Sequence, residues 1–303
     1  MMAGAIINRT VLLSDTKNYR GVVELNVYSD KDIQPDNEVA KIEHDSVVEA
    51  LGIIGARVVR CASAKNWQDS VYTANWAFCR RDVALMARLP NARKGEVKHA
   101  ERILRGLGKQ IIHPPRSIER YSGQGDTLAC GNVLFVGSGY RTDSGMADYL
   151  QHLWPDYTVV PVQTIPKLDE NGGVMINKVS GWEDSEFYDI DLAMAILRPP
   201  TEKNHGLIAV CNEAFSSESL QRIELACATN RIKMLDVDYN EAVNAFACNL
   251  ISNGVDKVVM STGAPTFAQK LRENKFEAIE RNLKELNKAG GGGRCIGLTL
   301  DND

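Results

Sequence analysis

The sequence lacks several features that would assign it to whole classes of protein. Over its 303 residues, no apolar run reaches the ~18–20 residues that a membrane-spanning helix needs. The formal net charge is −4, so the chain has no basic excess of the kind that draws a domain to nucleic acid. We therefore expect neither a membrane nor a nucleic acid as a partner.

Paired cysteines are also missing. The seven cysteines are scattered singly, their number is odd, and no C-x-x-C pair exists, which argues against a disulfide framework and a zinc finger. Free thiols are typical of a reducing compartment, so we expect a cytoplasmic protein. Neither a P-loop nor an early G-x-G-x-x-G is present, and no cluster has metal-ligand spacing, so we expect no metal and no cofactor.

Short apolar runs alternate with amphipathic stretches, which is typical of an α/β protein. Helices are predicted over Glu38–Leu51, Lys94–Leu107, Ser144–Leu153, Ser217–Asn230 and Pro265–Ala289. Strands are predicted over Arg9–Leu13, Ala56–Arg60, Val71–Ala77, Ala84–Ala87, Gln110–His113, Val133–Gly137, Tyr157–Val162, Leu192–Leu197, Leu207–Cys211, Lys233–Asp236, Ala247–Ser252, Lys257–Met260 and Cys295–Leu300. No Pro/Ser-rich linker divides the chain, so we expect one domain over residues 1–303. Strand–strand–helix–strand units recur loosely every ~50–60 residues, and five of them would close into a propeller.

A glycine run from Gly290 to Gly293 leads directly to Arg294 and Cys295. Glycine lets the backbone approach a ligand closely or adopt a positive φ. A thiol beside an arginine at the edge of a loop is expected to have a lowered pKa and to act as a nucleophile. The alternative is a flexible helix exit followed by a buried structural cysteine.

Two further segments carry polar side chains that suit ligand binding, and the first, Asp69–Phe78, has neither a helical nor a strand periodicity. Asp69 and Asn75 offer oxygen acceptors that match the donor fork of a guanidinium group, although turn or capping roles would explain them equally well. Arg88 and Arg93 flank a turn before a predicted helix, and arginine binds carboxylates through two parallel hydrogen bonds. A solvated basic loop is the alternative for this second segment.

Taken in order, these segments resemble the arginine-dihydrolase and dimethylarginine-dimethylaminohydrolase branch of the pentein superfamily, whose members modify guanidino groups. The resemblance rests on Glu24-Leu25-Asn26, Thr73-Ala74-Asn75, the segment from Arg88 to Glu96, Gly125-Asp126, the segment from Gly139 to Asp143, Ala214-Phe215-Ser216-Ser217-Glu218-Ser219, Ala247-Cys248-Asn249 and the glycine run with Cys295. It therefore covers most of the chain.

The resemblance implies an α/β fold, a pentein-type five-bladed propeller of pseudo-repeated ββαβ units, with an active site in its central channel. It implies that a cysteine attacks the guanidinium carbon of arginine or a methylated arginine and forms a covalent amidino-thioether, without a cofactor. The thiol position matches Cys295. The positions that contact the guanidino substrate match Asn26, Asp69, Asn75 and Asp191, and those for its α-carboxylate match Arg88 and Arg141.

Two positions depart from the family pattern. The Glu that usually precedes the Gly-x-Gly-Asp turn is Ser122 here, and the usual His of a His-x-Asp motif is Asp189. A histidine titrates near neutral pH and so suits proton transfer, and its loss costs ~10²–10⁴-fold in many enzymes. A carboxylate could take over only if its surroundings favoured the protonated form. His113 is an alternative base, although a structural role would account for it.

Three hypotheses follow from these residues. The first is an active cysteine hydrolase or amidinotransferase with an altered proton relay. The second is a catalytically weak or inactive relative that binds a guanidino ligand or acts as a regulatory or interaction protein. The third is an unrelated α/β protein. In the first two, the partner is an arginine-like small molecule, and a homo-oligomer is possible.

Overall fold

The computed structural model describes residues 6–20 and 23–302, and its named strands form five separate three-stranded sheets. In spatial order, the sheets are β15 (Leu298–Thr299), β1 (Thr10–Ser14) and β2 (Arg57–Cys61); β3 (Ala77–Arg80), β4 (Val83–Met86) and β5 (Gln110–Ile112); β6 (Thr127–Cys130), β7 (Val133–Gly137) and β8 (Thr158–Val162); β9 (Met194–Arg198), β10 (Gly206–Val210) and β11 (Ile232–Asp236); and β12 (Ile251–Ser252), β13 (Lys257–Ser261) and β14 (Glu277–Arg281).

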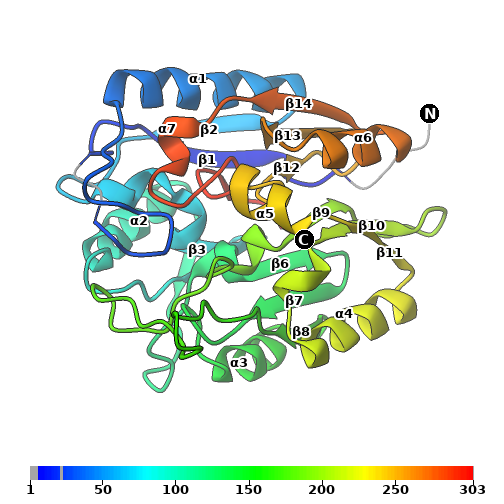
Figure 1. Ribbon diagram of the computed structural model, residues 1–303. Helices are drawn as coiled ribbons and strands as arrows, with labels where there is room; N and C mark the ends of the chain where they lie inside the picture. The colour runs from blue at the N-terminus through cyan, green and yellow to red at the C-terminus, as the bar shows by residue number, and fades with distance from the viewer. Residues whose placement is uncertain (1–5, 21–22, 303) are drawn as a thin grey trace.

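Every sheet has the same topology. An antiparallel pair of strands is followed, across a helix, by a third strand parallel to the second. The crossover helices are α1 (Asn37–Ile53), α2 (Lys94–Gly106), α3 (Gly145–Leu153), α4 (Ser217–Thr229) and α6 (Pro265–Glu273), while α5 (Tyr239–Ala245) and α7 (Lys284–Asn287) lie in connections. Figure 1 shows α1, α3 and α4 at the outer edge of the molecule, with the sheets toward its middle. This arrangement confirms the predicted ββαβ propeller.

Local sequence signals explain where several helices begin. The side chain of Asp36 accepts hydrogen bonds from the backbone N–H groups of Glu38 and Val39 at the start of α1. Ser216 caps α4 and Asp238 caps α5 in the same way, which satisfies donors that the first helical turn leaves unpaired. Among the described residues, no helix combines the length and apolarity needed to cross a membrane.

The ring is closed by the two ends of the chain. The C-terminal strand β15 pairs with β1, bringing Thr299 opposite Val11 and Leu298 opposite Leu12. The first strand of each sheet contacts its counterparts in neighbouring sheets, β15 beside β3, β6 beside β9 and β9 beside β12. These five strands therefore surround the axis, and the turns that lead into them meet there.

The predicted helix over Pro265–Ala289 is wrong. Helix α6 ends at Glu273, Lys275 adopts a left-handed conformation with φ of 65°, and the chain then forms β14 and α7. The apolar residues whose spacing suggested one long helix are divided among separate segments: Phe267 and Leu271 lie in α6, whereas Ile279 lies in β14 and pairs with Val259 of β13. The fifth sheet needs this strand to complete its parallel pair, and that requirement overrides the helical periodicity.

Three predicted strands are also shorter than expected or absent. The stretch Val71–Ala77 forms two 3₁₀ turns, Gln68–Val71 and Thr73–Trp76, before β3 begins. Of Ala247–Ser252 only the last two residues are extended, and of Cys295–Leu300 only Leu298–Thr299. In each case the missing part is a turn at the propeller axis.

Replacing Lys275 by glycine tests the break after α6. A side chain in the left-handed region costs ~1–2 kcal/mol that glycine does not incur. We expect Lys275→Gly to raise the free energy of unfolding by about 1 kcal/mol in urea denaturation, allowing for the greater freedom of glycine in the unfolded chain. Lys275→Ala keeps the Cβ atom and should leave stability near that of the original protein. Equal effects of both substitutions would contradict the assigned conformation.

Candidate active site

Cys295 lies on the turn that leads into β15 and is almost completely buried. Its Sγ lies 3.6 Å from Oδ2 and 3.9 Å from Oδ1 of Asp191, and it accepts a hydrogen bond of 3.2 Å from Nδ2 of Asn249. Thr73 anchors the turn, since its hydroxyl bonds to the carbonyls of Leu12 and Ile296. The last strand thus delivers the thiol to the axis of the ring.

Asp126, Asp189 and Asp191 form a cluster of buried carboxyl groups next to this thiol. Asp126 accepts hydrogen bonds from the backbone N–H of Ile190 at 3.0 Å and from the hydroxyl of Thr142 at 2.6 Å. Glycine at position 125 makes the cluster possible, because a Cβ atom there would lie 2.6 Å from Oδ2 of Asp189.

Asn75 joins the two positions at which the sequence departs from the family pattern. Its Nδ2 donates to Oδ2 of Asp189 at 2.8 Å and to Oγ of Ser122 at 2.9 Å. Its Oδ1 accepts from Nη1 of Arg93 at 2.9 Å, which fixes the orientation of the amide. Arg93 is buried and is held in turn by a bidentate pair with Glu96.

Two carboxylate oxygens in this region have no hydrogen-bond partner among the described residues, Oδ1 of Asp189 and Oδ1 of Asp69. Asp69 lies across Arg93 from Asn75, with Oδ2 at 3.8 Å from Nε of that arginine. Both side chains are more than nine-tenths buried. Buried acceptors without partners are rare in folded proteins, and here they are suited to a ligand that brings hydrogen-bond donors.

Burial favours the neutral forms of these acids. Desolvation, reinforced by the negative charge of Asp189, raises the pKa of Asp126 to about 8 and that of Asp191 well above its ordinary value. Desolvation also raises the pKa of Asp69 to about 6, although the nearby guanidinium of Arg93 opposes the shift. The site therefore holds fewer negative charges than its count of carboxyl groups suggests.

The expectation that Arg294 lowers the pKa of the thiol is wrong. Burial raises the pKa of Cys295 well above its ordinary value, and the charges of Asp191 and Asp189 raise it further. Hydrogen bonds from the backbone of Gly292 and the side chain of Asn249 act in the opposite direction.

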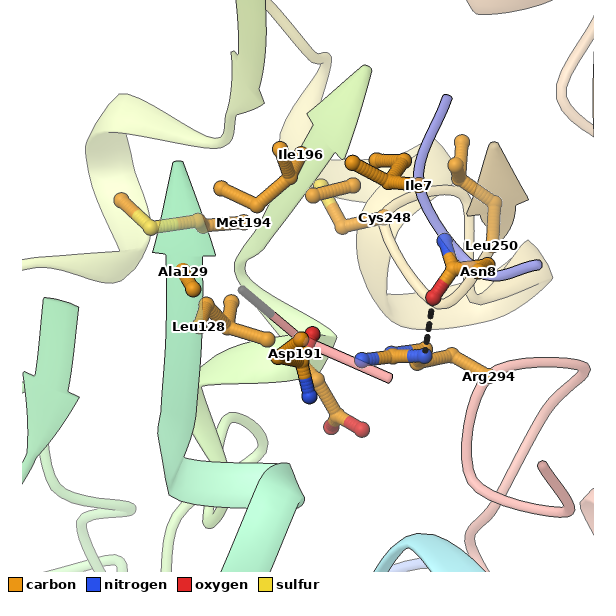
Figure 2. A pocket seen from close by; sticks show the side chains of 12 residues that line it. Ile7, Asn8, Leu128, Ala129, Asp191, Met194, Ile196, Cys248, Leu250 and Arg294 are labelled. Carbon is orange, nitrogen blue, oxygen red and sulfur yellow. Dashed lines mark hydrogen bonds between the residues drawn. The ribbon is translucent and has the colours of Figure 1, made fainter. Parts of the chain in front are cut away.

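The guanidinium of Arg294 borders a small cavity of about 30 Å³ (Figure 2), which Asn8, Asp191 and Cys248 also line. It donates to Oγ1 of Thr299 at 3.0 Å and to Oδ1 of Asn8 at 3.4 Å. Desolvation lowers its pKa to about 10, while the negative charge of Asp191 raises it.

The predicted substrate-binding residues are brought together only in part. Arg141 lies in the site, stacked 3.8 Å over the ring of Tyr188, with Nη1 at 4.0 Å from Oδ2 of Asp189. Asn26 contacts the glycine run, since its Nδ2 donates to the carbonyl of Ala289, and it borders a cleft of about 480 Å³. The guanidinium of Arg88 instead donates to the carbonyl of Pro114.

His113 does not replace the missing base. Its side chain is about half exposed, with Nε2 at 3.4 Å from a carboxylate oxygen of Glu101 at the protein surface. Among residues 6–20 and 23–302, no group of three or more His, Cys, Asp or Glu side chains could hold a metal ion.

Sequence reasoning named Arg93 only as one of two arginines flanking a turn, and it included Asp126 and Asn249 in family motifs without giving them a role in the site. Asp126 and Asn249 stand just before the first strand of their sheets, as Asn75, Asp191 and Cys295 do in theirs. An alignment of the five ββαβ units on their first strands would have identified Asp126 and Asn249. Arg93 carries no such signal, because its burial follows from the packing of α2 on the turn before β3.

A closed ring of five ββαβ units, with a thiol and carboxyl groups on its axis, defines a pentein-type propeller. Comparison with family models agrees, because residues 24–300 match the model described as N,N dimethylarginine dimethylhydrolase, eukaryotic. The chain belongs to this family, which confirms the resemblance inferred from its motifs.

Curated relatives include two enzymes of this kind. The bifunctional arginine dihydrolase/ornithine cyclodeaminase AgrE of Nostoc sp. is 29% identical over 240 residues, 78% of this chain, but the chain spans only 30% of that protein. The N(G),N(G)-dimethylarginine dimethylaminohydrolase of Mycobacterium tuberculosis is 27% identical over 277 residues, 91% of this chain and 80% of that protein.

Solved structures support the fold. The N-terminal domain of ArgZ, a cyanobacterial arginine dihydrolase bound to its product, has a TM-score of 0.80 at 24% identity and covers 97% of both chains. A dimethylarginine dimethylaminohydrolase with an S-methyl-L-thiocitrulline adduct has a TM-score of 0.70 at 18% identity, with 96% of this chain and 99% of that chain covered.

The raised pKa of Asp126 predicts how stability depends on pH. A carboxyl group whose pKa rises from 3.8 to about 8 on folding stabilises the protein fully below pH ~4, and this contribution is lost as the pH rises toward 8. We therefore expect the urea midpoint of the original protein to fall between pH 5 and pH 8, and that of Asp126→Asn to fall less.

Asp156→Asn is the control for this experiment. Asp156 is an exposed carboxylate whose pKa the side chain of Arg80 lowers to about 2, so it stays ionised throughout the range tested. Its substitution should shift the midpoint equally at both pH values. A slope for Asp126→Asn as steep as that of the original protein would contradict the assigned shift.

Proposed function

We propose that the protein is a cysteine-dependent hydrolase that acts on the guanidino group of an arginine-like small molecule, and that residues 1–303 act as one domain. The observation that carries this proposal is a buried thiol beside carboxyl groups, with unpartnered oxygens on Asp69 and Asp189. A guanidinium is planar, cationic and rich in N–H donors, so it would satisfy both oxygens and offset the negative charge.

The reaction begins when a bound guanidinium keeps Asp191 ionised, so that this carboxylate, at 3.6 Å, accepts the thiol proton as Sγ of Cys295 attacks the guanidinium carbon. The bond from that carbon to the leaving nitrogen then breaks, and the proton taken from the thiol passes through Asp189 to that nitrogen, so that ammonia or an alkylamine departs. An amidino-thioether remains on the cysteine. Water adds to its carbon, the C–S bond breaks, and a ureido product leaves as the thiol is restored.

In this scheme, the positive charge of the substrate helps to form the nucleophile. The pKa of Cys295 is high because burial and two aspartates disfavour the thiolate. A bound guanidinium brings a positive charge into the same dry volume, which stabilises the thiolate and the neighbouring carboxylates together. The nucleophile would therefore form chiefly when substrate is present.

The second candidate is a relative that binds a guanidino ligand without efficient turnover. The contact that favours it is the bond from Asn75 to both Ser122 and Asp189, which occupy the positions where the family usually has Glu and His. Transfer of the amidino group to an amine in place of water is an alternative outcome of the first candidate, whereas a cytoplasmic location and a homo-oligomer are predictions that accompany either candidate.

Incubation with arginine, monomethylarginine, dimethylarginine and agmatine separates the two candidates. We expect citrulline or another ureido product together with an adduct on Cys295, both detected by mass spectrometry. Cys295→Ser should abolish both signals while retaining thermal stabilisation by the ligand. Stabilisation without product or adduct in the original protein would support the binder, and no response to any of the four compounds would refute both candidates.

Substituting Asp189 tests the altered proton relay. Asp189→Asn keeps the shape of the side chain but removes its carboxylate, so we expect turnover to fall by ~10²–10⁴-fold, the usual effect of losing a general acid or base. His113→Gln should leave turnover within about twofold, because the structure places this histidine at the surface. The reverse pattern in steady-state kinetics would assign the proton transfer to His113.

A further inference from the structure

Asn249 is the contribution of the fifth sheet to the axis. It stands just before β12, where Asn75, Asp126, Asp191 and Cys295 stand before the first strands of the other four sheets. Its side chain is completely buried, although it contacts neither of the unpartnered oxygens proposed to bind substrate. A fully buried amide is costly unless its donors and acceptor are satisfied, so its contacts show what it does.

The network fixes which way this amide points. Its Oδ1 accepts hydrogen bonds from the backbone N–H groups of Gly292 at 3.1 Å, Arg294 at 3.0 Å and Cys295 at 3.1 Å. Backbone N–H groups can only donate, so the oxygen must face them and the NH₂ group must face the other side. There, Nδ2 donates to Sγ of Cys295 and to the carbonyl of Asp191, both at 3.2 Å.

These contacts have two separate consequences. The oxygen gathers three N–H groups of the glycine-rich turn and thereby sets the position of the thiol. The NH₂ group supplies a donor to sulfur, and a donor favours the thiolate over the thiol because the anion is the better acceptor. Asp191 acts on the same sulfur in the opposite sense, through its negative charge.

We propose that Asn249 is a positioning residue for the nucleophile, which holds the turn of Cys295 and favours its thiolate against the field of Asp191. The inference rests on the proposed function only in naming Cys295 as the nucleophile. A substrate is not needed to test it, because the ionisation of the thiol can be followed by alkylation.

The test is the rate at which iodoacetamide modifies Cys295 as a function of pH, read by peptide mass spectrometry in folded protein. Asn249→Asp keeps an oxygen toward the turn, removes the N–H donor to sulfur and brings a carboxylate beside it, so both changes disfavour the thiolate. A hydrogen bond to a charged group is worth about 1.5–3 kcal/mol, so we expect the alkylation midpoint to rise by about one to two pH units. Alkylation at neutral pH should slow by about 10–100-fold.

Cys61 provides an internal control in the same samples, since it is partly exposed and lies outside the site. Its modification should be unchanged by Asn249→Asp. Asp191→Asn should move the Cys295 midpoint downward, because it removes the opposing charge. An Asn249→Asp protein that is folded, as judged by its thermal midpoint, and that titrates within 0.3 pH unit (about twofold in rate) of the original would overturn the proposal.

A second measurement on the unmodified protein covers the case in which Asn249→Asp does not fold. The side-chain NH₂ resonances of Asn249 should shift with pH at the same midpoint as the alkylation of Cys295, and this shift should vanish in Cys295→Ser. Resonances that stay constant through the thiol titration would overturn the proposal. Loss of turnover without any change in the thiol titration would indicate a fault in the proposed reaction instead.

Discussion

The pairing of β15 with β1 is the constraint on which the rest of the structure depends. It joins the last strand of the chain to the first sheet and closes the ring, so that each of the five sheets has three strands. The same strand carries Cys295 to the axis, where Thr73 anchors the turn through carbonyls of both chain ends. The strand pairing that closes the ring therefore also places the nucleophile.

The axis concentrates polar groups that a hydrophobic core would ordinarily exclude. Neutralisation limits the free-energy cost of burying these acids, since burial favours the protonated forms of Asp126 and Asp191. Hydrogen bonding lowers the free-energy cost of burial further, because the guanidinium of Arg93 donates to both Glu96 and Asn75. In this region a pair of carboxylate oxygens, on Asp69 and Asp189, stays unsatisfied, and these are the groups that a cationic ligand would engage. Stability and ligand binding thus place opposite demands on the same side chains.

Sequence patterns predicted four of the five crossover helices and most outer strands because each is amphipathic or continuously apolar over its own length. They failed over Pro265–Ala289, where the spacing of Phe267, Phe276 and Ile279 suits a helix but the chain forms a helix, a strand and a second short helix. They failed again at the axial turns, such as Thr73–Trp76, whose apolar residues are buried by neighbouring sheets and not by a local period. Both errors arise where contacts distant in sequence decide the conformation.

The sequence by itself determined the class of the protein, because the order of its short motifs carries the chemistry of the family: a cysteine after a glycine run, acidic and amide side chains, and two arginines. The tertiary structure alone decided how these groups behave. Ring closure buried the thiol against Asp191 and so raised its pKa, where the adjacent Arg294 had suggested the opposite. It also turned Arg88 toward Pro114 and brought Asn249 onto the sulfur. Burial and orientation are properties of the assembled ring, and no local segment encodes them.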